Sequence, residues 1–436
     1  MSLDVLEQAR AAKSASRVLA KLSETDKNLL LEKVAQQLGR NADSILAANA
    51  LDAKDACAMV EKGELSQALY QRLLLSPDKL KGMILAVRAV AELPDPAGRV
   101  LARTLLDEGL VLEKVSCPLG LLAVIFESRP DAITQITSLA IKSGNAVILK
   151  GGSEVTRTMK AALAAIHTGL EGVVPTDAVT GVYGRDAVAA LLTMHGTIDL
   201  VIPRGSNALV QHIQQNTLIP VLGHADGVCH VYIDVAANPE MAIDIAVDSK
   251  VQYPAACNAA ETFLVHSGIA ANFLPKLAKS LAAEGVRIRG CARTERILAD
   301  YTVDAVSGEQ WHTEYSDRTV AIRVVENMDD AVDHIERYGS HHTEVIVTDD
   351  ETSAQRFLAD VDSANVYHNC STRFADGFRY GFGAEVGIST SKMHARGPVG
   401  LDGLVTYKYK LSGSGQIVRD YAGPGGKTFL HKHLDI

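Results

Sequence analysis

The stretch Gly120-Leu-Leu-Ala-Val-Ile-Phe126 begins the part of the sequence that decides the fold. Short apolar runs and helical patterns alternate from here to about residue 234. Because several of these runs contain no alternating polar residues, both faces of each strand must be covered, as in a parallel sheet. The pattern predicts a doubly wound α/β domain, in which ligands bind at the carboxyl ends of the strands. The predicted strands are residues 121–126, 146–149, 178–182, 199–202 and 228–233, and the predicted helices are residues 131–143, 154–170, 185–195 and 207–215.

Two of the predicted strands end in residues that suit a phosphate group. Ile148-Leu-Lys-Gly-Gly-Ser153 and Val201-Ile-Pro-Arg-Gly-Ser-Asn207 each pass from a strand, through glycine, into a helix. Glycine lets a backbone approach a phosphate closely, the start of a helix supplies N–H donors, and Lys or Arg supplies positive charge. Taken singly, each stretch is also compatible with an ordinary strand-to-helix turn. Together they predict a dinucleotide site, although the usual Gly-x-Gly-x-x-Gly fingerprint is absent.

A second α/β block surrounds one cysteine. Cys257 lies in Val251-Gln-Tyr-Pro-Ala-Ala-Cys-Asn-Ala-Ala-Glu261, between a helical pattern at 241–250 and a strand pattern at 262–265. Its small neighbours leave the sulfur unshielded, and Pro254 ends the preceding helix, so the backbone can turn and present the thiol. We expect a helix to begin near Cys257, and its N–H groups would favour a thiolate and bind a developing oxyanion. The alternative is a small buried apolar residue, as most isolated cysteines are.

The remaining sequence predicts N-terminal helices and a small sheet made of distant segments. Helical patterns fill the first ~95 residues, with a strong start signal at Ser76-Pro77-Asp78. Residues 100–106 and 110–115 form a hairpin pattern, which the late runs at 404–411 and 416–418 are candidates to join. A hairpin this apolar needs a docking partner, for which another subunit is a candidate. The other strand patterns after Cys257 are 286–289, 320–325, 345–347 and 364–366, and the helical patterns are 271–283, 328–337 and 353–359.

Composition and charge exclude several classes of protein. The chain has 436 residues, which suggests two to three domains, and its net charge of -9 argues against a nucleic-acid surface. No apolar run approaches the ~18 residues of a membrane span, and the N-terminus lacks a signal-peptide pattern. The six cysteines form no Cys-x-x-Cys pair, so we expect reduced thiols in a cytoplasmic protein. His341 and His342 are adjacent, a spacing that argues against a shared metal ion, and we expect no metal site.

Several stretches are similar to a known family. They are Phe126-Glu-Ser-Arg-Pro-Asp131, Leu149-Lys-Gly-Gly152, Ile202-Pro-Arg-Gly-Ser206, Tyr253-Pro-Ala-Ala-Cys-Asn258, Ala331-Val-Asp-His-Ile-Glu-Arg-Tyr-Gly-Ser-His-His-Thr-Glu344, Asn369-Cys-Ser-Thr-Arg-Phe374 and His394-Ala-Arg-Gly-Pro398. Over essentially its whole length the chain resembles the aldehyde dehydrogenase superfamily. Within it, these stretches resemble the γ-glutamyl phosphate reductases of proline biosynthesis, as a stand-alone enzyme or as the reductase half of a bifunctional synthase.

The resemblance implies an aldehyde dehydrogenase-like α/β fold, with two doubly wound α/β domains and a small β oligomerisation element. We expect a dinucleotide-binding domain at residues 1–97 and 119–224 and a catalytic domain, with the nucleophilic Cys, at residues 225–395. The oligomerisation hairpin and the C-terminal strands would occupy residues 98–118 and 396–436. The implied assembly is a homodimer or a homotetramer.

The implied reaction is the reduction of L-glutamyl 5-phosphate by NADPH to L-glutamate 5-semialdehyde and phosphate, through a thioester on Cys257. Ser128 and the Cys257 N–H are the candidate oxyanion donors. Oxidising relatives carry a water-activating Glu where this chain has Val221, and the absence of that base suits a reductase. A CoA-acylating aldehyde dehydrogenase is the alternative enzyme, and a non-catalytic scaffold is the alternative from another class. Because the acyl phosphate is labile, glutamate 5-kinase is a candidate partner.

The resemblance also assigns binding residues. The candidates for NADP(H) are Lys150, Gly151, Ser153, Gly205, Ser206 and Glu314. Ser153 is small where NAD-preferring relatives often carry Glu, which favours NADP, whereas the adjacent Glu154 weakens that argument. For Glu314, a solvated surface carboxylate is an equally good interpretation. The candidates for the substrate are Arg129, Asn258, Asn369, Ser371, Thr372, Arg373 and Arg396. Planar guanidinium groups suit the substrate's anions, and a structural salt bridge is the alternative for each Arg.

Overall fold

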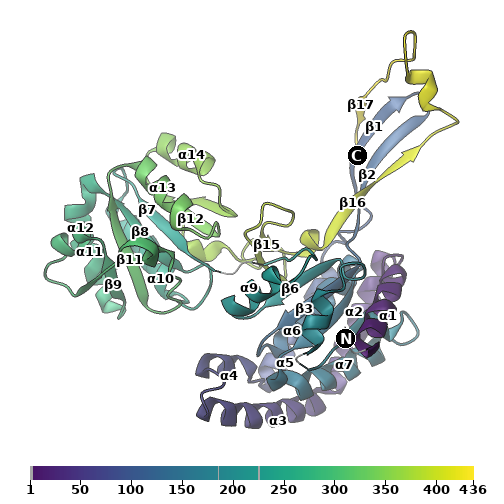
Figure 1. Ribbon diagram of the computed structural model, residues 1–436, viewed down its shortest axis with the longest axis horizontal. Coiled ribbons are helices and arrows are strands. Elements are labelled where there is room, and N and C mark those ends of the chain that lie inside the picture. Colours follow the sequence, from purple (N-terminus) through teal and green to yellow (C-terminus); the bar gives the residue numbers. More distant parts are fainter. Residues whose placement is uncertain (1–2, 185, 224–225) are drawn as a thin grey trace. The chain divides into compact units, whose positions relative to one another are not determined.

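The computed structural model describes residues 3–184, 186–223 and 226–436, which form two compact units (Figure 1). Unit 1 comprises Met1–Leu222, Phe382–Gly387 and Val399–Ile436, and unit 2 comprises Gly223–Gly381 and Ile388–Pro398. The domain boundary expected between residues 224 and 225 lies outside the described residues. The roles expected of the domains stay predictions.

Helices form the N-terminal part of unit 1, as the sequence predicts. They are α1 (Leu3–Leu19), α2 (Glu24–Arg40), α3 (Ala42–Glu61), α4 (Gln67–Leu73) and α5 (Pro77–Glu92). Ser76 caps α5, because its hydroxyl accepts a hydrogen bond from the Lys79 N–H at 3.1 Å, and Pro77 takes the first helical position. The apolar side of α2 is buried where this helix packs against α5 and α7.

A parallel sheet with the order β5-β4-β3-β6 forms the centre of unit 1. Its strands are β3 (Leu121–Phe126), β4 (Ala146–Gly151), β5 (Val179–Gly181) and β6 (Leu200–Arg204), and its helices are α6 (Pro130–Ser143), α7 (Thr156–Leu170), α8 (Asp186–Leu192) and α9 (Asn207–Gln215). Every residue of β3 is buried, because α1 and α6 pack against the sheet. The doubly wound domain is thus confirmed. Residue 185, where we expected α8 to begin, lies outside the described residues.

A small antiparallel sheet has the order β16-β2-β1-β17 (Figure 1). The predicted hairpin forms β1 (Val100–Asp107) and β2 (Leu110–Pro118), and the predicted late strand forms β16 (Val405–Ser412). The strand predicted at residues 416–418 is wrong. Gln416 is tied to the hairpin by its side-chain amide, which donates to Glu108 O at 2.9 Å, and a 3-10 turn, η6 (Val418–Tyr421), follows. The strand beside β1 is instead β17 (Lys432–Leu434), whose polar sequence gives no strand signal.

Unit 2 contains a parallel sheet with the order β10-β9-β11-β8-β7-β12-β13. The strands are β7 (Cys229–Ile233), β8 (Ala260–His266), β9 (Arg287–Gly290), β10 (Val303–Ala305), β11 (Thr319–Val325), β12 (Thr343–Val347) and β13 (Asn365–His368). The helices are α10 (Pro239–Val251), α11 (Ser267–Ala283), α12 (Ala292–Ile297), α13 (Met328–Tyr338) and α14 (Glu351–Asp360). Short 3-10 turns are η3 (Gly308–His312) and η4 (Thr372–Phe374), and a two-stranded ladder joins β14 (Gly387–Ser389) to β15 (Gly397–Val399).

Helices cover both faces of the unit 2 sheet. Because side chains alternate along a strand, Val231 and Ile233 of β7 pack with α10 and α11, whereas Tyr232 packs with α13 and α14. This second doubly wound domain confirms the predicted fold class. The alternating pattern alone had grouped residues 228–233 with the first block, whereas the domain limits expected from the resemblance grouped them with Cys257, and they lie in unit 2. A strand's own pattern does not encode which sheet it joins, and β7 pairs with β8 and β12.

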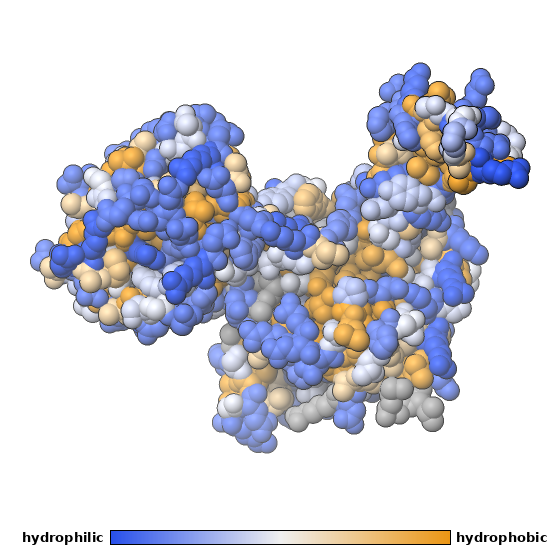
Figure 2. Space-filling view, turned by 45° about the horizontal axis from the view of Figure 1, so that its top comes forward, coloured by the Kyte–Doolittle hydropathy of each residue, from blue (hydrophilic) through white to orange (hydrophobic). Residues whose placement is uncertain are grey.

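The surface is mixed, with hydrophobic residues scattered among hydrophilic ones on the face that Figure 2 shows. In the described part of the chain, we find no helix that combines the length and the apolar character needed to cross a bilayer.

Candidate active site

The cofactor-binding residues predicted in unit 1 meet at one edge of its sheet. β3 lies between β4 and β6, so the carboxyl ends of these parallel strands are neighbours. Lys150 and Gly151 end β4, and Gly205 and Ser206 follow β6. The chain order reverses at β3, and open α/β sheets bind ligands at such a reversal. The structure therefore brings these four residues together.

Close packing explains the glycines at this edge. A Cβ atom on Gly151 would lie 2.6 Å from a methyl carbon of Val155, and one on Gly205 would lie 2.5 Å from a carboxylate oxygen of Glu127. Both contacts are with the ends of side chains, which would have to move to admit a Cβ atom, so glycine fits these close-packed turns without displacing its neighbours. Ser153 lies beside this edge, exposed, at the start of the 3-10 turn η1 (Ser153–Val155).

Two carboxylates cross-link the loops at this edge. Glu127 Oε2 accepts a hydrogen bond from the Ser206 N–H at 2.8 Å. Glu154 Oε1 accepts from both the N–H and the hydroxyl of Ser128, at 2.7 and 2.9 Å. Burial lowers the pKa of Lys150, and attraction to these carboxylates opposes the shift. Sequence reasoning missed Glu127, although its position directly after a buried strand at the order reversal was a usable signal.

Ser128 lies in this region with its hydroxyl already engaged. The residue is fully buried, its φ is 47°, and its hydroxyl donates its single proton to Glu154. The hydroxyl would have to leave that carboxylate before it could donate to an oxyanion. Arg129 follows at the N-cap position of α6 and is half-buried.

In unit 2, Cys257 lies in two successive turns between α10 and β8. The Ala256 N–H donates to Tyr253 O at 3.1 Å, and the Ala259 N–H donates to Ala256 O at 2.9 Å. The helix that we expected near Cys257 is therefore absent from this fully described segment. α10 ends at Val251 and β8 starts at Ala260, and the residues between them form turns and bends. The thiol is half-buried.

Arg373 is the cation associated with this cysteine. Arg373 is buried, with 8% of its surface exposed to solvent. Its Nε donates a hydrogen bond to Gln252 Oε1 at 2.9 Å. Burial lowers the pKa of Arg373 most strongly, and the charge of Arg379 lowers it further. Arg373 Cζ also lies 5.9 Å from the centre of the Tyr253 ring, so its guanidinium is next to the segment that leads into the cysteine turn. Gln252, which sequence reasoning missed, orients the group.

The segment around Arg373 also brings other predicted residues to the cysteine turn. Asn258 Nδ2 donates to Ala375 O at 2.7 Å, which ties the turn to η4. Ser371 and Thr372 are tied to α10, because the Ser249 hydroxyl donates to Ser371 Oγ at 3.2 Å and accepts from the Thr372 N–H at 3.2 Å. Two buried polar atoms, Asn258 Oδ1 and Thr372 Oγ1, have no hydrogen-bond partner among the described residues.

Two predicted substrate residues are held elsewhere. The Asn369 amide binds both backbone groups of Thr348, with its Oδ1 3.0 Å from the N–H and its Nδ2 2.9 Å from the carbonyl. Thr348 follows β12 at the carboxyl edge of the sheet, whereas Cys257 precedes β8 at the opposite edge. Arg396 donates to Asp362 Oδ1 at 2.9 Å and to its backbone carbonyl at 3.1 Å, the salt bridge that we gave as the alternative.

Glu314 is not a freely solvated carboxylate. It is half-buried, and its Oε2 accepts a hydrogen bond from the Gly227 N–H at 3.0 Å. Across the described ranges, no group of three or more His, Cys, Asp or Glu residues is arranged to hold a metal ion.

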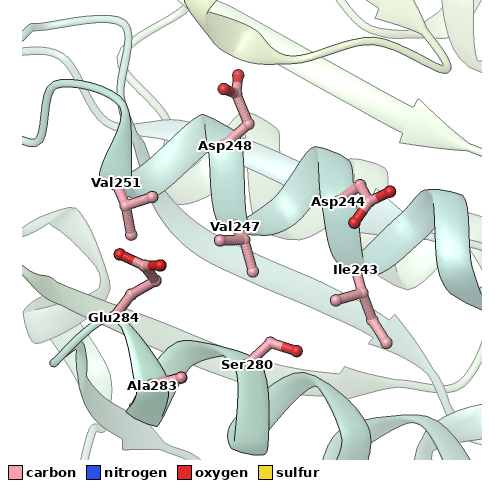
Figure 3. Close-up of a pocket in the computed structure, with 8 residues that line it drawn as sticks. All are labelled: Ile243, Asp244, Val247, Asp248, Val251, Ser280, Ala283 and Glu284. Carbon is pink, nitrogen blue, oxygen red and sulfur yellow. The ribbon is translucent and has the colours of Figure 1, made fainter.

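A surface groove of about 450 Å³ lies between α10 and α11 (Figure 3). Figure 3 shows the apolar side chains of α10 directed toward α11, while Asp248 points away. The lining residues are Ile243, Asp244, Val247, Asp248, Val251, Ser280, Ala283 and Glu284. Since this lining includes no predicted site residue, we keep the groove apart from the candidate active site.

Comparisons with known proteins agree with this architecture. The sequence model described as "Aldehyde dehydrogenase family" matches residues 2–287. The γ-glutamyl phosphate reductase of Cyanothece sp. is 52% identical over 434 residues, which are 99% of this chain and 98% of that protein. The crystal structure of γ-glutamyl phosphate reductase from Thermotoga maritima shares 38% identity and a TM-score of 0.91, covering 95% of this chain and 99% of that one.

A more distant likeness bears on the alternative enzyme. An acetylating aldehyde dehydrogenase from Geobacillus thermoglucosidasius is 16% identical, with a TM-score of 0.63 over 95% of this chain and 97% of that one. That likeness shows a shared fold, whereas the full-length identity favours the reductases over the CoA-acylating enzymes. The chain therefore belongs to the aldehyde dehydrogenase family and, within it, to the γ-glutamyl phosphate reductases.

Proposed function

We propose that this protein reduces L-glutamyl 5-phosphate with NADPH to L-glutamate 5-semialdehyde and phosphate, a step of proline biosynthesis. The observation that carries the proposal is 52% identity over 99% of the chain to a protein named for this reaction. The arrangement around Cys257 supports it, because the buried Arg373 is hydrogen-bonded to Gln252, in the segment that leads into the turn of the half-buried thiol. The non-catalytic scaffold has no support in this arrangement.

In the proposed mechanism, the Cys257 thiolate attacks the acyl carbon, and the bond between that carbon and the phosphate oxygen breaks. Phosphate leaves with the electron pair, and a thioester remains on Cys257. Arg373 attracts the anionic substrate by its charge. The Cys257 N–H holds the oxyanion, with Ser128 as the second candidate. Val221 has no group that can activate water, so the thioester is spared from hydrolysis.

The edge of the unit 1 sheet suits a dinucleotide. Glycine at residues 151 and 205 would let a phosphate approach the backbone closely, and the Ser206 N–H binds a carboxylate oxygen, that of Glu127. Bound NADPH supplies the hydride that converts the thioester to the aldehyde level. Lys150 and Ser206 would hold its phosphates, and Glu314 its nicotinamide ribose. No metal ion has a role in this proposal.

We assign the preference to NADP. Ser153 is exposed and small, which leaves room for a 2′-phosphate. The neighbouring Glu154, which weakened this argument in the sequence, has its carboxylate turned to Ser128. In the variant Ser153→Glu, like charges would meet, so kcat/KM with NADPH should fall at least tenfold while that with NADH stays within threefold. An unchanged NADPH value would remove Ser153 from the cofactor site.

For the substrate, we propose that Arg373 and Arg129 meet the anionic groups and that Asn258, Ser371 and Thr372 meet the amino-acid end. Unpartnered buried polar atoms are costly, and the substrate's amine would give Asn258 Oδ1 a donor. Asn369 and Arg396 stay candidates whose side chains would first have to leave Thr348 and Asp362.

The reaction is tested in the reverse direction, which avoids the unstable acyl phosphate. Purified protein is given glutamate semialdehyde and NADP, with and without inorganic phosphate, and NADPH absorbance is followed. We expect NADPH formation only with phosphate. Formation without phosphate would indicate a hydrolytic dehydrogenase, and formation with CoA alone would indicate the acylating enzyme.

The nucleophile is tested with a matched pair of variants. Cys257→Ala should abolish turnover and keep NADPH binding. Cys57→Ala, at an exposed site, should leave turnover unchanged. Turnover in Cys257→Ala would show that another residue is the nucleophile.

We further propose that β16 pairs with a second copy of the chain in a homodimer or homotetramer. β16 is an edge strand, and Tyr407, Tyr409 and Leu411 are exposed along one side of it. A monomer at micromolar concentration in sizing experiments would contradict this. Glutamate 5-kinase is the proposed partner for transfer of the labile acyl phosphate, and the protein is proposed to act in the cytoplasm.

A further inference from the structure

A backbone segment of unit 2, residues 227–230, lies against the turn that carries Cys257. A Cβ atom on Gly227 would be 2.1 Å from the Cys257 carbonyl oxygen and 2.7 Å from its Cα and carbonyl carbon. All three are backbone atoms, so no flexible side chain can move aside to make room. Gly227 is therefore required for the approach of the two backbones.

The same segment donates a hydrogen bond to the nucleophile's backbone. Cys229 Sγ lies 3.3 Å from Cys257 O, with the thiol as donor. Burial raises the pKa of Cys229 well above its usual value, and the negative charge of Glu344 raises it further. The thiol thus keeps its proton and remains available to the carbonyl.

Side chains from three later segments fix this region in place. They accept hydrogen bonds from its backbone N–H groups: Glu314 from Gly227 at 3.0 Å, Ser340 from Val228 at 2.9 Å, and Glu344 from His230 at 2.9 Å. The segment is thus held independently of the Cys257 turn and can act as a support for it.

We propose that Gly227 and Cys229 are positioning residues that fix the backbone of Cys257 and so keep its sulfur and its N–H aligned for acyl transfer. The inference rests on the proposed function in one respect, the assignment of Cys257 as the nucleophile. Acyl transfer requires the reacting atoms to be aligned to within tenths of an ångström, and a misplacement of about 1 Å can cost about 10²-fold in rate. A side chain at residue 227 forces a shift of that size.

The test uses an acyl donor that needs neither the substrate nor the cofactor. p-Nitrophenyl acetate acylates a reactive thiol and releases nitrophenolate, so the burst that is absent in Cys257→Ala reports acylation of Cys257. In Gly227→Ala we expect the burst rate constant to fall at least tenfold, and toward about 10²-fold. NADPH affinity should stay close to wild type, and the protein should remain folded at the temperature of the assay. Gly82→Ala is the matched control, because a Cβ there meets nothing within 4 Å.

Cys229 is tested by a pair of variants in case Gly227→Ala fails to fold. Cys229→Ala removes the donor and should slow the burst about threefold to tenfold, whereas Cys229→Ser keeps a donor and should restore at least half of the wild-type rate.

A Gly227→Ala burst within threefold of wild type overturns the role of Gly227. Equal rates in Cys229→Ala and Cys229→Ser overturn the role of the hydrogen bond. A wild-type burst that does not depend on Cys257 would instead refute the nucleophile and, with it, the proposed function.

Discussion

The buried imidazole of His334 makes the stability of unit 2 depend on pH. His334 belongs to α13 and is 2% exposed. Burial, and after it the nearby charges of His230, Arg323 and His312, lower its pKa to about 2. An Arg323 N–H donates to His334 Nδ1, so a proton on that nitrogen would face a donor and a positive charge. The folded protein therefore keeps this ring neutral.

The size of the effect follows from the two pKa values of His334. In the unfolded chain the pKa is about 6.5, and the folded-state pKa is depressed, so the unfolded state takes up the proton first as the pH falls. Stability is thus complete above about pH 6.5 and is lost below it, by about 1.4 kcal/mol for each pH unit. Between pH 6.5 and 5, His334 alone should remove about 2 kcal/mol from the free energy of unfolding.

The variant His334→Gln tests this reasoning. Glutamine can accept from Arg323 through its carbonyl oxygen, but it does not titrate. Urea unfolding is followed by the fluorescence of Trp311, the single tryptophan of the chain, which lies in unit 2 with its ring 5.1 Å from that of His334. Between about pH 7 and pH 5, the wild type should lose about 2 kcal/mol more than the variant. Between about pH 7 and pH 8, the two proteins should change in parallel.

Equal losses in wild type and variant between about pH 7 and pH 5 would refute the argument, whatever the variant's stability at pH 7. Such a result would mean that the folded state accepts the proton, by a local opening of α13 or by movement of Arg323.

Two further predictions concern buried charges in unit 2. Lys250 and Glu261 form a 2.6 Å ion pair with both side chains fully buried, so Lys250→Met should lower the free energy of unfolding by about 3–5 kcal/mol. The double variant Lys250→Met with Glu261→Leu should recover most of this loss. If Lys250→Met alone stays within about 1 kcal/mol of wild type in the Trp311 assay, that result would count against a buried charge at Glu261. Arg373→Lys loses the planar guanidinium group and its hydrogen bond to Gln252. The KM for glutamate semialdehyde should therefore rise at least tenfold, with unchanged NADPH affinity. A KM within twofold of wild type would exclude Arg373 from substrate binding.

Most elements could be predicted because their signals are local. The start of α5 at Ser76 and Pro77 and the buried strands β3 and β4 depend on residues that are close in sequence. The failures depend on distant partners. β17 has no apolar run and becomes a strand because β1 offers it a free edge. β7 has the expected pattern, yet its sheet is decided by pairing with β12, more than a hundred residues later.

The same distinction separates the candidate site residues. The positions of Gly151 and Gly205 between a strand and a helix could be predicted, because that pattern depends on neighbouring residues, whereas their role in cofactor binding stays a prediction. For the polar side chains, the residue type alone could not separate candidates for substrate binding from members of structural salt bridges. Arg373 and Arg396 look alike in sequence, but the first is oriented by Gln252 near Cys257, whereas the second is bound to Asp362. Which acceptor lies beside each guanidinium is a property of the folded chain alone.

The order of elements around each group decides which edge of its own sheet the group occupies. Lys150 ends a strand and precedes a helix, which places it at the carboxyl edge of the parallel sheet of unit 1. Cys257 follows a helix and precedes a strand, which places it at the amino edge of the parallel sheet of unit 2. Both placements could be predicted, because the order of strand and helix around a residue is local information in the sequence.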